Sequence, residues 1–171
     1  MEFAKKEVED DLDVKPVSFS DFKVLTTGNR HDQRDFTFSE KFSLDGLVKK
    51  AGNNYIVNIG NLIGGQIQVK DQQRQRKYNV YMPYPRTLSY TIRFAIPEGY
   101  VAEGIENLNR SVENETGSFI SKAVMETNKV VVTVNKTYKH SFEEAADWNK
   151  LLLFLDTAYD FSQQKILLKK K

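Results

Sequence analysis

The residue types that most often carry catalysis or bind metals are scarce in this chain. Its 171 residues include no cysteine and two histidines, His31 and His140. The lack of cysteine excludes disulfides, thiolate zinc sites and a thiol nucleophile. His31, Asp32 and Asp35 place three metal-ligating side chains in one short segment. We interpret that segment as an ordinary polar turn, because two histidines are too few for the usual metal sites. The sequence therefore predicts no metal and no cofactor.

The remaining polar pairs do not have the pattern of a nucleophile with its base. His140 directly precedes Ser141, but catalytic triads are assembled through space rather than between sequence neighbours. Ser141 and Glu144 have the spacing of a helix capping box, and Glu143 and Glu144 suit the positive end of a helix dipole. We therefore predict a hydrogen-bonded histidine beside a helix cap, no catalytic residue, and a protein that is not an enzyme.

A glycine-rich segment lies at residues 59–65, Ile-Gly-Asn-Leu-Ile-Gly-Gly, after a predicted strand. A phosphate-binding loop ends in Gly-Lys-Ser/Thr and opens a helix, and this segment has neither feature. It is predicted to be a bulge or a tight turn.

One stretch, residues 78–86, has the composition of a binding surface. It places Tyr78, Tyr81 and Tyr84 near Arg86. Tyrosine rings form platforms for sugars and peptides, and they are also ordinary packing residues at strand edges. Both interpretations stay open from the sequence, and these four residues are the predicted interaction surface.

Charge and hydropathy argue against two classes of partner. The net charge is +2, and the basic runs at 74–77 and 169–171 are short, whereas nucleic-acid-binding domains show a broad basic excess or a basic stripe. No apolar run approaches the roughly 20 residues that span a bilayer. Residues 1–13 are charged and lack the apolar centre of a signal peptide. The protein is therefore expected to be cytosolic or a fragment of a longer exported chain, with no nucleic-acid partner and no transmembrane segment.

The elements that must position these side chains are mostly strands. Residues 36–44 alternate strictly apart from Glu40, and residues 88–96 alternate Leu, Tyr, Ile, Phe and Ile with smaller or polar residues, which is the pattern of strands with one buried face. A hairpin is predicted from 119–125 and 129–137 across Thr127 and Asn128. Polar residues 26–34 have turn chemistry. Further strands are predicted at 17–25, 55–59, 66–69, 78–82 and 165–168.

One helix interrupts this pattern near the end of the chain. It is predicted to begin at the capping box of Ser141, and its apolar stripe consists of Trp148, Leu151, Leu152, Leu155 and Tyr159. Such a stripe packs on a core, so the helix is expected to lie across a sheet or close one end of a sandwich. The predicted fold is mainly β, an antiparallel β-sandwich of about eight or more strands with one C-terminal α-helix packed on it.

A length of 171 residues is sufficient for one domain with its own core. Residues 1–13 are predicted to be a charged connector with some helical character. Residues 14–171 are predicted to form a single β-sandwich-like domain, with a sub-boundary near residue 70 as the alternative division.

The second half of the chain resembles a known family. The resemblance consists of residues 76–84 (RKYNVYMPY), the turn at 96–100 (IPEGY), the polar hairpin at 114–118 (NETGS), and the ending 148–170, a helix followed by a Lys-Ile-Leu-Leu-Lys strand. These are similar, in order and spacing, to the C-terminal domain of unknown function that follows a transglutaminase-like core in exported Bacteroidetes proteins.

That resemblance implies a parent protein with a signal peptide, an N-terminal β domain and a transglutaminase-like fold upstream. The catalytic Cys, His and Asp would lie in that fold, so no catalytic role transfers to any residue here. The implied location is periplasmic, cell-surface or secreted. The expected partners are the upstream domains of the parent chain, together with protein, peptide or glycan.

Two functions follow as alternatives. The first is a non-catalytic accessory domain that packs beside a transglutaminase- or peptidase-like core, or helps to position its protein or peptide substrate. It predicts an exposed apolar patch near residues 78–84. The second is an independent carbohydrate- or ligand-binding β-sandwich module, which predicts a concave site with exposed aromatic rings.

Overall fold

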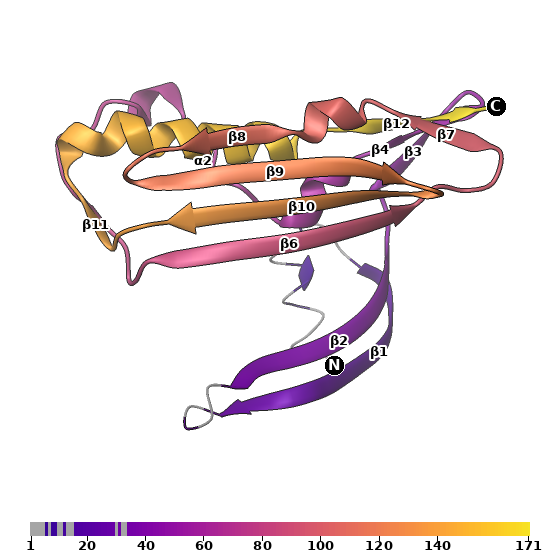
Figure 1. Cartoon of the computed structure of the whole chain (residues 1–171), viewed down its shortest axis with the longest axis horizontal. Helices are drawn as coiled ribbons and strands as arrows, with labels where there is room; N and C mark the ends of the chain where they lie inside the picture. Colours follow the sequence, from indigo (N-terminus) through magenta and orange to yellow (C-terminus); the bar gives the residue numbers. More distant parts are fainter. Residues whose placement is uncertain (1–5, 7, 10–11, 13–15, 30, 32–33) are drawn as a thin grey trace. The chain divides into compact units, whose positions relative to one another are not determined.

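The computed structural model describes residues 6, 8–9, 12, 16–29, 31 and 34–171 and divides the chain into two compact units (Figure 1). The first unit is Met1–Leu47 and the second is Val48–Lys171. The predicted connector at residues 1–13 lies mostly outside the described residues and stays a prediction. The predicted domain from residue 14 to residue 171 spans both units, and residue 70 lies within the second.

The first unit is built on a long antiparallel hairpin of β1 (Pro16–Asn29) and β2 (Arg34–Leu44). Both predicted strands are present, but the predicted turn at residues 26–34 begins too early. Pairing continues through Thr26, which lies opposite Thr37, and the two hydroxyl oxygens are 2.6 Å apart. Branched threonine side chains suit a pleated strand, so these polar residues extend the ladder instead of ending it.

Aromatic rings line this hairpin. The ring centroids of Phe19 and Phe42 are 5.9 Å apart, and those of Phe22 and Phe38 are 5.5 Å apart. Phe36 lies 5.8 Å from Phe38. Such cross-strand and diagonal ring pairs are a main source of stability in a two-stranded ribbon. The alternating pattern predicted for residues 36–44 therefore describes how the aromatic side chains are placed along β2.

The second unit contains the remaining strands, four short 3-10 helices and helix α2. Its strands are β3 (Val48–Ala51), β4 (Asn54–Val57), β5 (Val80–Tyr81), β6 (Arg86–Ala95), β7 (Tyr100–Glu103), β8 (Arg110–Glu113), β9 (Gly117–Glu126), β10 (Lys129–Tyr138), β11 (Phe142–Glu143) and β12 (Ile166–Lys170). Its helices are η1 (Ile59–Ile63), η2 (Asp71–Gln73), η3 (Ile105–Leu108), η4 (Ala145–Asp147) and α2 (Trp148–Ser162).

These strands form two four-stranded antiparallel sheets and one short ribbon. The first sheet has the order β6-β10-β9-β8, the second has the order β3-β4-β12-β7, and β11 pairs with β5. The hairpin predicted across Thr127 and Asn128 is confirmed as β9 and β10, and the strand predicted at residues 88–96 is confirmed as β6. The predicted last strand is β12, which lies between β4 and β7.

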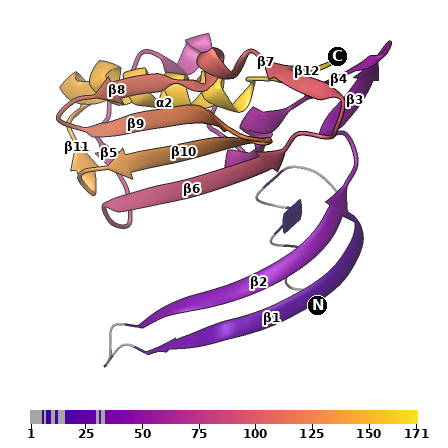
Figure 2. The ribbon, with the colours of Figure 1, turned by 45° about the vertical axis from the view of Figure 1, so that its right-hand side comes forward.

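One apolar core joins both sheets to the helix. It includes the inward side chains of β10, Val57 of β4 and Ile166 of β12. Helix α2 packs along β8 and β9 (Figure 2). Four of the five predicted stripe residues are buried and Tyr159 is partly buried; the helix also buries Phe154, Ala158 and Phe161. The mainly β fold with one C-terminal helix packed on it is confirmed.

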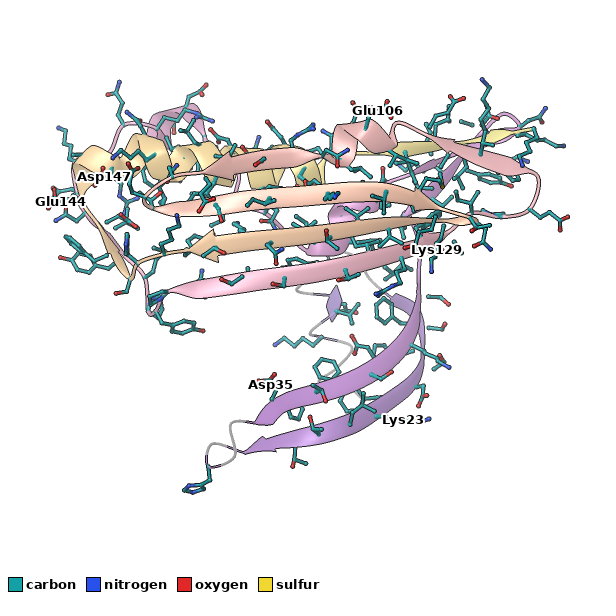
Figure 3. The ribbon with its side chains drawn as sticks, in the orientation of Figure 1. Lys23, Asp35, Glu106, Lys129, Glu144 and Asp147 are labelled. Carbon is teal, nitrogen blue, oxygen red and sulfur yellow. The ribbon has the colours of Figure 1, made fainter. Side chains whose placement is uncertain are left out.

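The predicted helix start at Ser141 is wrong. The segment is extended at Phe142–Glu143, which forms β11, and α2 begins at Trp148 with Asp147 as its N-cap residue. Glu144 and Asp147 both lie before the helix (Figure 3). The side chain of Asp147 makes no cap hydrogen bond with the first turn of α2. The Glu143 side chain is instead buried in β11, and its Oε1 atom lies within hydrogen-bond distance of His140 Nδ1.

Two other predicted strands are corrected. Residues 66–69 form no strand. The Gln66 side-chain amide donates to the carbonyl oxygens of Ile63 and Gly64, so this segment makes local hydrogen bonds instead of pairing with a neighbouring strand. The strand predicted at residues 78–82 is reduced to the two residues of β5.

The glycine-rich segment, predicted to be a bulge or a tight turn, forms the 3-10 helix η1 over Ile59–Ile63. Gly60 lies directly against the carbonyl oxygens of Phe161 and Ser162, and its amide donates to the Gln164 carbonyl at 3.0 Å. This close approach of two backbones explains the glycine.

Candidate functional site

Four exposed aromatic rings gather around the short ribbon of β5 and β11. The exposed fractions are 81% for Tyr78, 77% for Tyr81, 61% for Tyr84 and 41% for Phe142. Tyr81 and Phe142 are directly paired across the ribbon, with ring centroids 5.1 Å apart. We call these four residues the aromatic ribbon. The structure therefore brings a fourth ring, not predicted from the sequence, to the three predicted tyrosines.

The strand period explains why two of these rings, Tyr81 and Phe142, point outward. In β11, Glu143 is buried and its neighbour Phe142 is exposed, and in β5 the partly buried Val80 alternates with exposed Tyr81. The ribbon is extended by a hydrogen bond from the Met82 amide to the Ser141 carbonyl at 2.8 Å. Because β11 was predicted to be the first turn of a helix, Phe142 could not be assigned to the surface from the sequence.

Two contacts tie the ribbon to the start of α2. The Arg76 Nε atom donates to the Tyr78 carbonyl at 2.9 Å, and its guanidinium carbon lies 4.8 Å from the Trp148 ring centroid. The Asn79 side-chain oxygen accepts from the Ala145 amide at 3.0 Å. The rings are thus presented by a segment that is fixed at several points, which lowers the entropy that a partner must remove.

Arg86, the fourth predicted surface residue, lies differently. It is the first residue of β6, it is half-buried, and it pairs with Tyr138 of β10. Its guanidinium carbon is 4.6 Å from the Tyr138 ring centroid and 6.0 Å from the Tyr84 ring centroid. Arg86 therefore connects the edge of the aromatic ribbon to a buried group of polar side chains.

The centre of that buried group is Lys136. It lies on β10, in phase with the buried Val130, Val132 and Val134, and only 4% of it is exposed. Its Nζ atom donates to Gln66 Oε1 at 2.8 Å and lies 5.2 Å from the Tyr138 ring centroid. We call Lys136, Arg86, Tyr138 and Gln66 the Lys136 cluster.

Burial and charge change the acid–base properties of this cluster. Burial, together with the positive charge of Arg86, lowers the pKa of Lys136 to about 8. Burial also raises the pKa of the Tyr138 hydroxyl, and Arg86 partly offsets that rise. Sequence reasoning missed Lys136, although a signal existed: a lysine occupies the valine phase of a strand that was itself predicted.

A cavity of about 450 Å³ lies between α2 and the segment that precedes β5. Its lining is mostly polar and consists of Gln68, Val69, Lys70, Asp71, Arg74, Asp156, Tyr159 and Asp160. Arg74 bonds both carboxylate oxygens of Asp156, at 2.9 and 3.0 Å, and so ties the two walls together. The remaining Asp160 and Tyr159 offer hydrogen-bonding groups to a polar ligand.

The predicted polar turn around His31 includes Asp32, which lies outside the described residues. In the part of the chain that the structure describes, no three His, Cys, Asp or Glu side chains gather as metal ligands. His140 Nδ1 lies 2.9 Å from Glu143 Oε1, so its partner is a β11 carboxylate rather than a helix cap. None of the described helices is both long and apolar enough to cross a membrane.

Comparison with known families gives one match. Residues 54–168, two-thirds of the chain, match the family model DUF3858, described as "Domain of Unknown Function with solved-structure structure". The match covers the aromatic ribbon, the Lys136 cluster and α2. No curated protein and no solved structure matches the chain.

Proposed function

The chain belongs to the DUF3858 family, and on that premise we propose that it is a non-catalytic accessory domain of a larger exported protein. In this proposal the domain packs beside a transglutaminase- or peptidase-like core of its parent chain, or helps that core to position a protein or peptide substrate. The parent architecture rests on the resemblance of residues 76–84, 96–100, 114–118 and 148–170 to the domain that follows such a core in Bacteroidetes proteins.

The aromatic ribbon is the observation that supports a docking role. Tyr78 and Tyr81 each expose more than three-quarters of their surface, and Tyr84 and Phe142 extend the same patch. Tyrosine and other aromatic residues are enriched among the residues that contribute most to protein interfaces. Their rings bury a large area and lose little rotamer freedom, and here Arg76 and Asn79 already hold the backbone that carries them.

Hydrogen exchange tests this role. The chain is compared alone and joined to the upstream core of its parent protein, and the amides of residues 78–84 and 141–143 are followed. We expect slower exchange at these amides in the joined protein. The double variant Tyr78→Ala/Tyr81→Ala should lose that protection, whereas Ile67→Ala, which removes another exposed apolar side chain, should keep it. Equal exchange in the isolated and joined proteins would contradict docking through the ribbon.

The proposed exported location has a separate test. Within the parent gene, the reading frame upstream of residue 1 should encode a signal peptide and a core with Cys, His and Asp. A parent chain without them would overturn both the transglutaminase association and the periplasmic, cell-surface or secreted location.

The cavity beside α2 favours a second candidate function, a carbohydrate- or ligand-binding module. Carboxylate and amide groups such as Asp160 and Gln68 are suited to hydroxyl-rich ligands, and Tyr159 offers an aromatic edge. A glycan array is the direct test. A glycan that binds the chain but not its Asp160→Asn variant would support this function, and an array without signal would remove it.

A further inference from the structure

Lys136 is a buried cation in an apolar row. It follows Val130, Val132 and Val134 on the inward face of β10, and each of these four residues is at most 4% exposed. Transferring an ammonium group out of water is strongly unfavourable unless an anion or several hydrogen bonds replace the water. The lysine stem could pack there as a hydrocarbon, but the Nζ atom requires a polar partner.

The charged group that acts on Lys136 is Arg86, which is itself a cation. Arg86 lies opposite Tyr138 on the neighbouring strand, and both cationic groups face the same tyrosine ring, at 4.6 Å for Arg86 and 5.2 Å for Lys136. Among the described residues, no aspartate or glutamate forms an ion pair with either of them. Within the described part of the chain, both positive charges therefore lie at one tyrosine ring and no carboxylate neutralises either of them.

The hydrogen-bond acceptor of Lys136 is neutral. Gln66 Oε1 lies 2.8 Å from Nζ, and the amide nitrogen of the same side chain donates to the Ile63 and Gly64 carbonyls at 3.1 and 3.3 Å. Gln66 belongs to a segment without regular secondary structure, and it is partly exposed, as is Arg86. The cluster therefore reaches solvent on the side where Gln66 and Arg86 lie.

We propose that the Lys136 cluster is a binding site for a carboxylate group, free in solution or carried on a peptide. The planar fork of Arg86 matches the two oxygens of a carboxylate, and the Lys136 ammonium supplies a second positive charge at the same Tyr138 ring. Without a ligand, the Gln66 side-chain oxygen is the hydrogen-bond acceptor of Lys136 Nζ. When a carboxylate binds, one of its oxygens joins or replaces the Gln66 oxygen. This inference does not depend on the aromatic ribbon and stands whether or not the ribbon docks on a partner.

The acid–base state of the cluster is compatible with this role. With a pKa of about 8, Lys136 is roughly nine-tenths protonated at pH 7 and is available as a cation. A bound carboxylate favours the charged form, so binding must raise the pKa of Lys136. Arg86 of β6 is the charged group that lowers this pKa, and the Tyr138 ring of β10 lies beside Nζ with a hydroxyl pKa raised above its usual value of 10, so neither group is an anion near neutral pH; Tyr90 of β6 acts on Tyr138.

The test is a titration of the full chain labelled with ¹³C at lysine Cε, followed by NMR. Sodium acetate is added at constant ionic strength, with sodium chloride as the balancing salt. We expect a saturable shift of the Lys136 signal and a rise of its pKa toward the ordinary lysine value. A signal that responds equally to chloride, or that does not respond, would overturn the proposal.

Variants locate the response. Lys136→Met keeps the length of the stem without charge, and it should weaken acetate binding at least tenfold, as read from amide shifts of β10. Arg86→Lys keeps the charge but loses the fork, and a several-fold loss is expected. The matched control is Lys122→Met, an exposed lysine of β9, which should leave the affinity within about twofold. Equal weakening by Lys122→Met would show that general charge, not this site, attracts acetate.

A second variant keeps the test decisive if Lys136→Met does not fold. Gln66→Glu places a carboxylate beside Nζ within the chain, so it should raise the pKa of Lys136 and abolish the acetate response. An acetate response that persists in this variant would contradict the site.

Three further ligands test whether the natural ligand is a free carboxylate or a peptide, and whether its charged group is a carboxylate or a phosphate. A short peptide with a central glutamate should bind more tightly than acetate if the natural ligand is a peptide, and its glutamine counterpart should not bind. Saturation by acetate with no gain from the glutamate peptide would assign the site to a free carboxylate. Saturation by inorganic phosphate at lower concentration than acetate would overturn the carboxylate assignment. If none of these ligands gives a response while the aromatic ribbon is still protected from hydrogen exchange in the joined protein, the carboxylate site is rejected and the docking proposal stands.

Discussion

Gly117, the first residue of β9, lies directly against the ring of Phe154 from helix α2. A Cβ atom at position 117 would come within 2.6 Å of Phe154 Cε1, and it would also meet the carbonyl oxygen of Thr137. The contact involves a fully buried ring on one side and a strand backbone on the other. This glycine therefore permits the close packing of α2 on the β8–β9 edge of the sheet, through lack of a side chain rather than through an unusual backbone conformation.

Gly117→Ala is expected to destabilise the chain by about 2 kcal/mol, since an added methyl group in a packed core forces side chains or backbone to shift. Urea unfolding measures the effect. The matched control is Gly65→Ala, because a Cβ at Gly65 meets no atom within 4 Å. Equal stability of the Gly117 variant and the wild type would show that the helix can move away at little cost.

Gly60→Ala tests the contact of η1 with the end of α2. The new methyl group would collide with the Phe161 and Ser162 carbonyl oxygens and disturb the hydrogen bond from the Gly60 amide to Gln164. Backbone atoms cannot rotate away as a side chain can, so a loss of at least about 2 kcal/mol is expected. Hydrogen exchange should locate the damage at residues 59–65 and the last turn of α2; faster exchange confined to β1 and β2 would contradict this reasoning.

Phe154→Ala is expected to cost about 3–5 kcal/mol, because the ring is fully buried against Tyr138 at a centroid distance of 5.3 Å and truncation leaves a cavity. Leu153→Ala, one residue earlier on the exposed face of the same helix, should change stability by less than about 0.5 kcal/mol. Thermal and urea unfolding of both variants measure the difference. Similar losses would mean that α2 does not pack on the sheet through the face described.

The lowered pKa of Lys136 predicts a specific pH dependence of stability. Between pH 8 and 10.5 the unfolded chain binds this proton more tightly than the folded protein does, so stability from this group rises with pH. Relative to Lys136→Met, the wild type should gain about 2 kcal/mol between pH 8 and pH 10. Urea unfolding at both pH values measures it, in carboxylate-free buffer.

Tyr138 acts in the opposite direction, since its raised pKa means that stability from this group is lost as pH rises through its titration. Tyr138 is present in both the wild type and the Lys136→Met variant, so its contribution cancels when their stabilities are compared at the same pH. A stability difference that stays constant from pH 8 to pH 10 would show that Lys136 titrates as an exposed lysine.

Local chemistry predicted much of the second unit. Alternation in β6 and β10, the turn at Thr127 and Asn128, and the apolar stripe from Trp148 to Leu155 each depend on residues close in sequence. The buried face that accompanies them follows from strand and helix periods alone. One error arose where a distant partner decided the outcome: Phe142 and Glu143 form a strand because β5 lies beside them, although the spacing of Ser141 and Glu144 suits a helix cap.

The sequence by itself determined a cysteine-free, mainly β chain with one late helix, since composition and periodicity are properties of single segments. Only the tertiary structure decided which side chains form a site. The predicted Tyr78, Tyr81 and Tyr84 gained Phe142 as a fourth ring, and Arg86 turned from the surface toward Tyr138. Lys136 became a buried cation near another cation because the antiparallel pairing of β6 with β10 places Arg86 opposite Tyr138, two residues along the strand from Lys136. Charge, burial and hydrogen bonding depend on distances in space, and these are set when the sheets and the helix close over a common core.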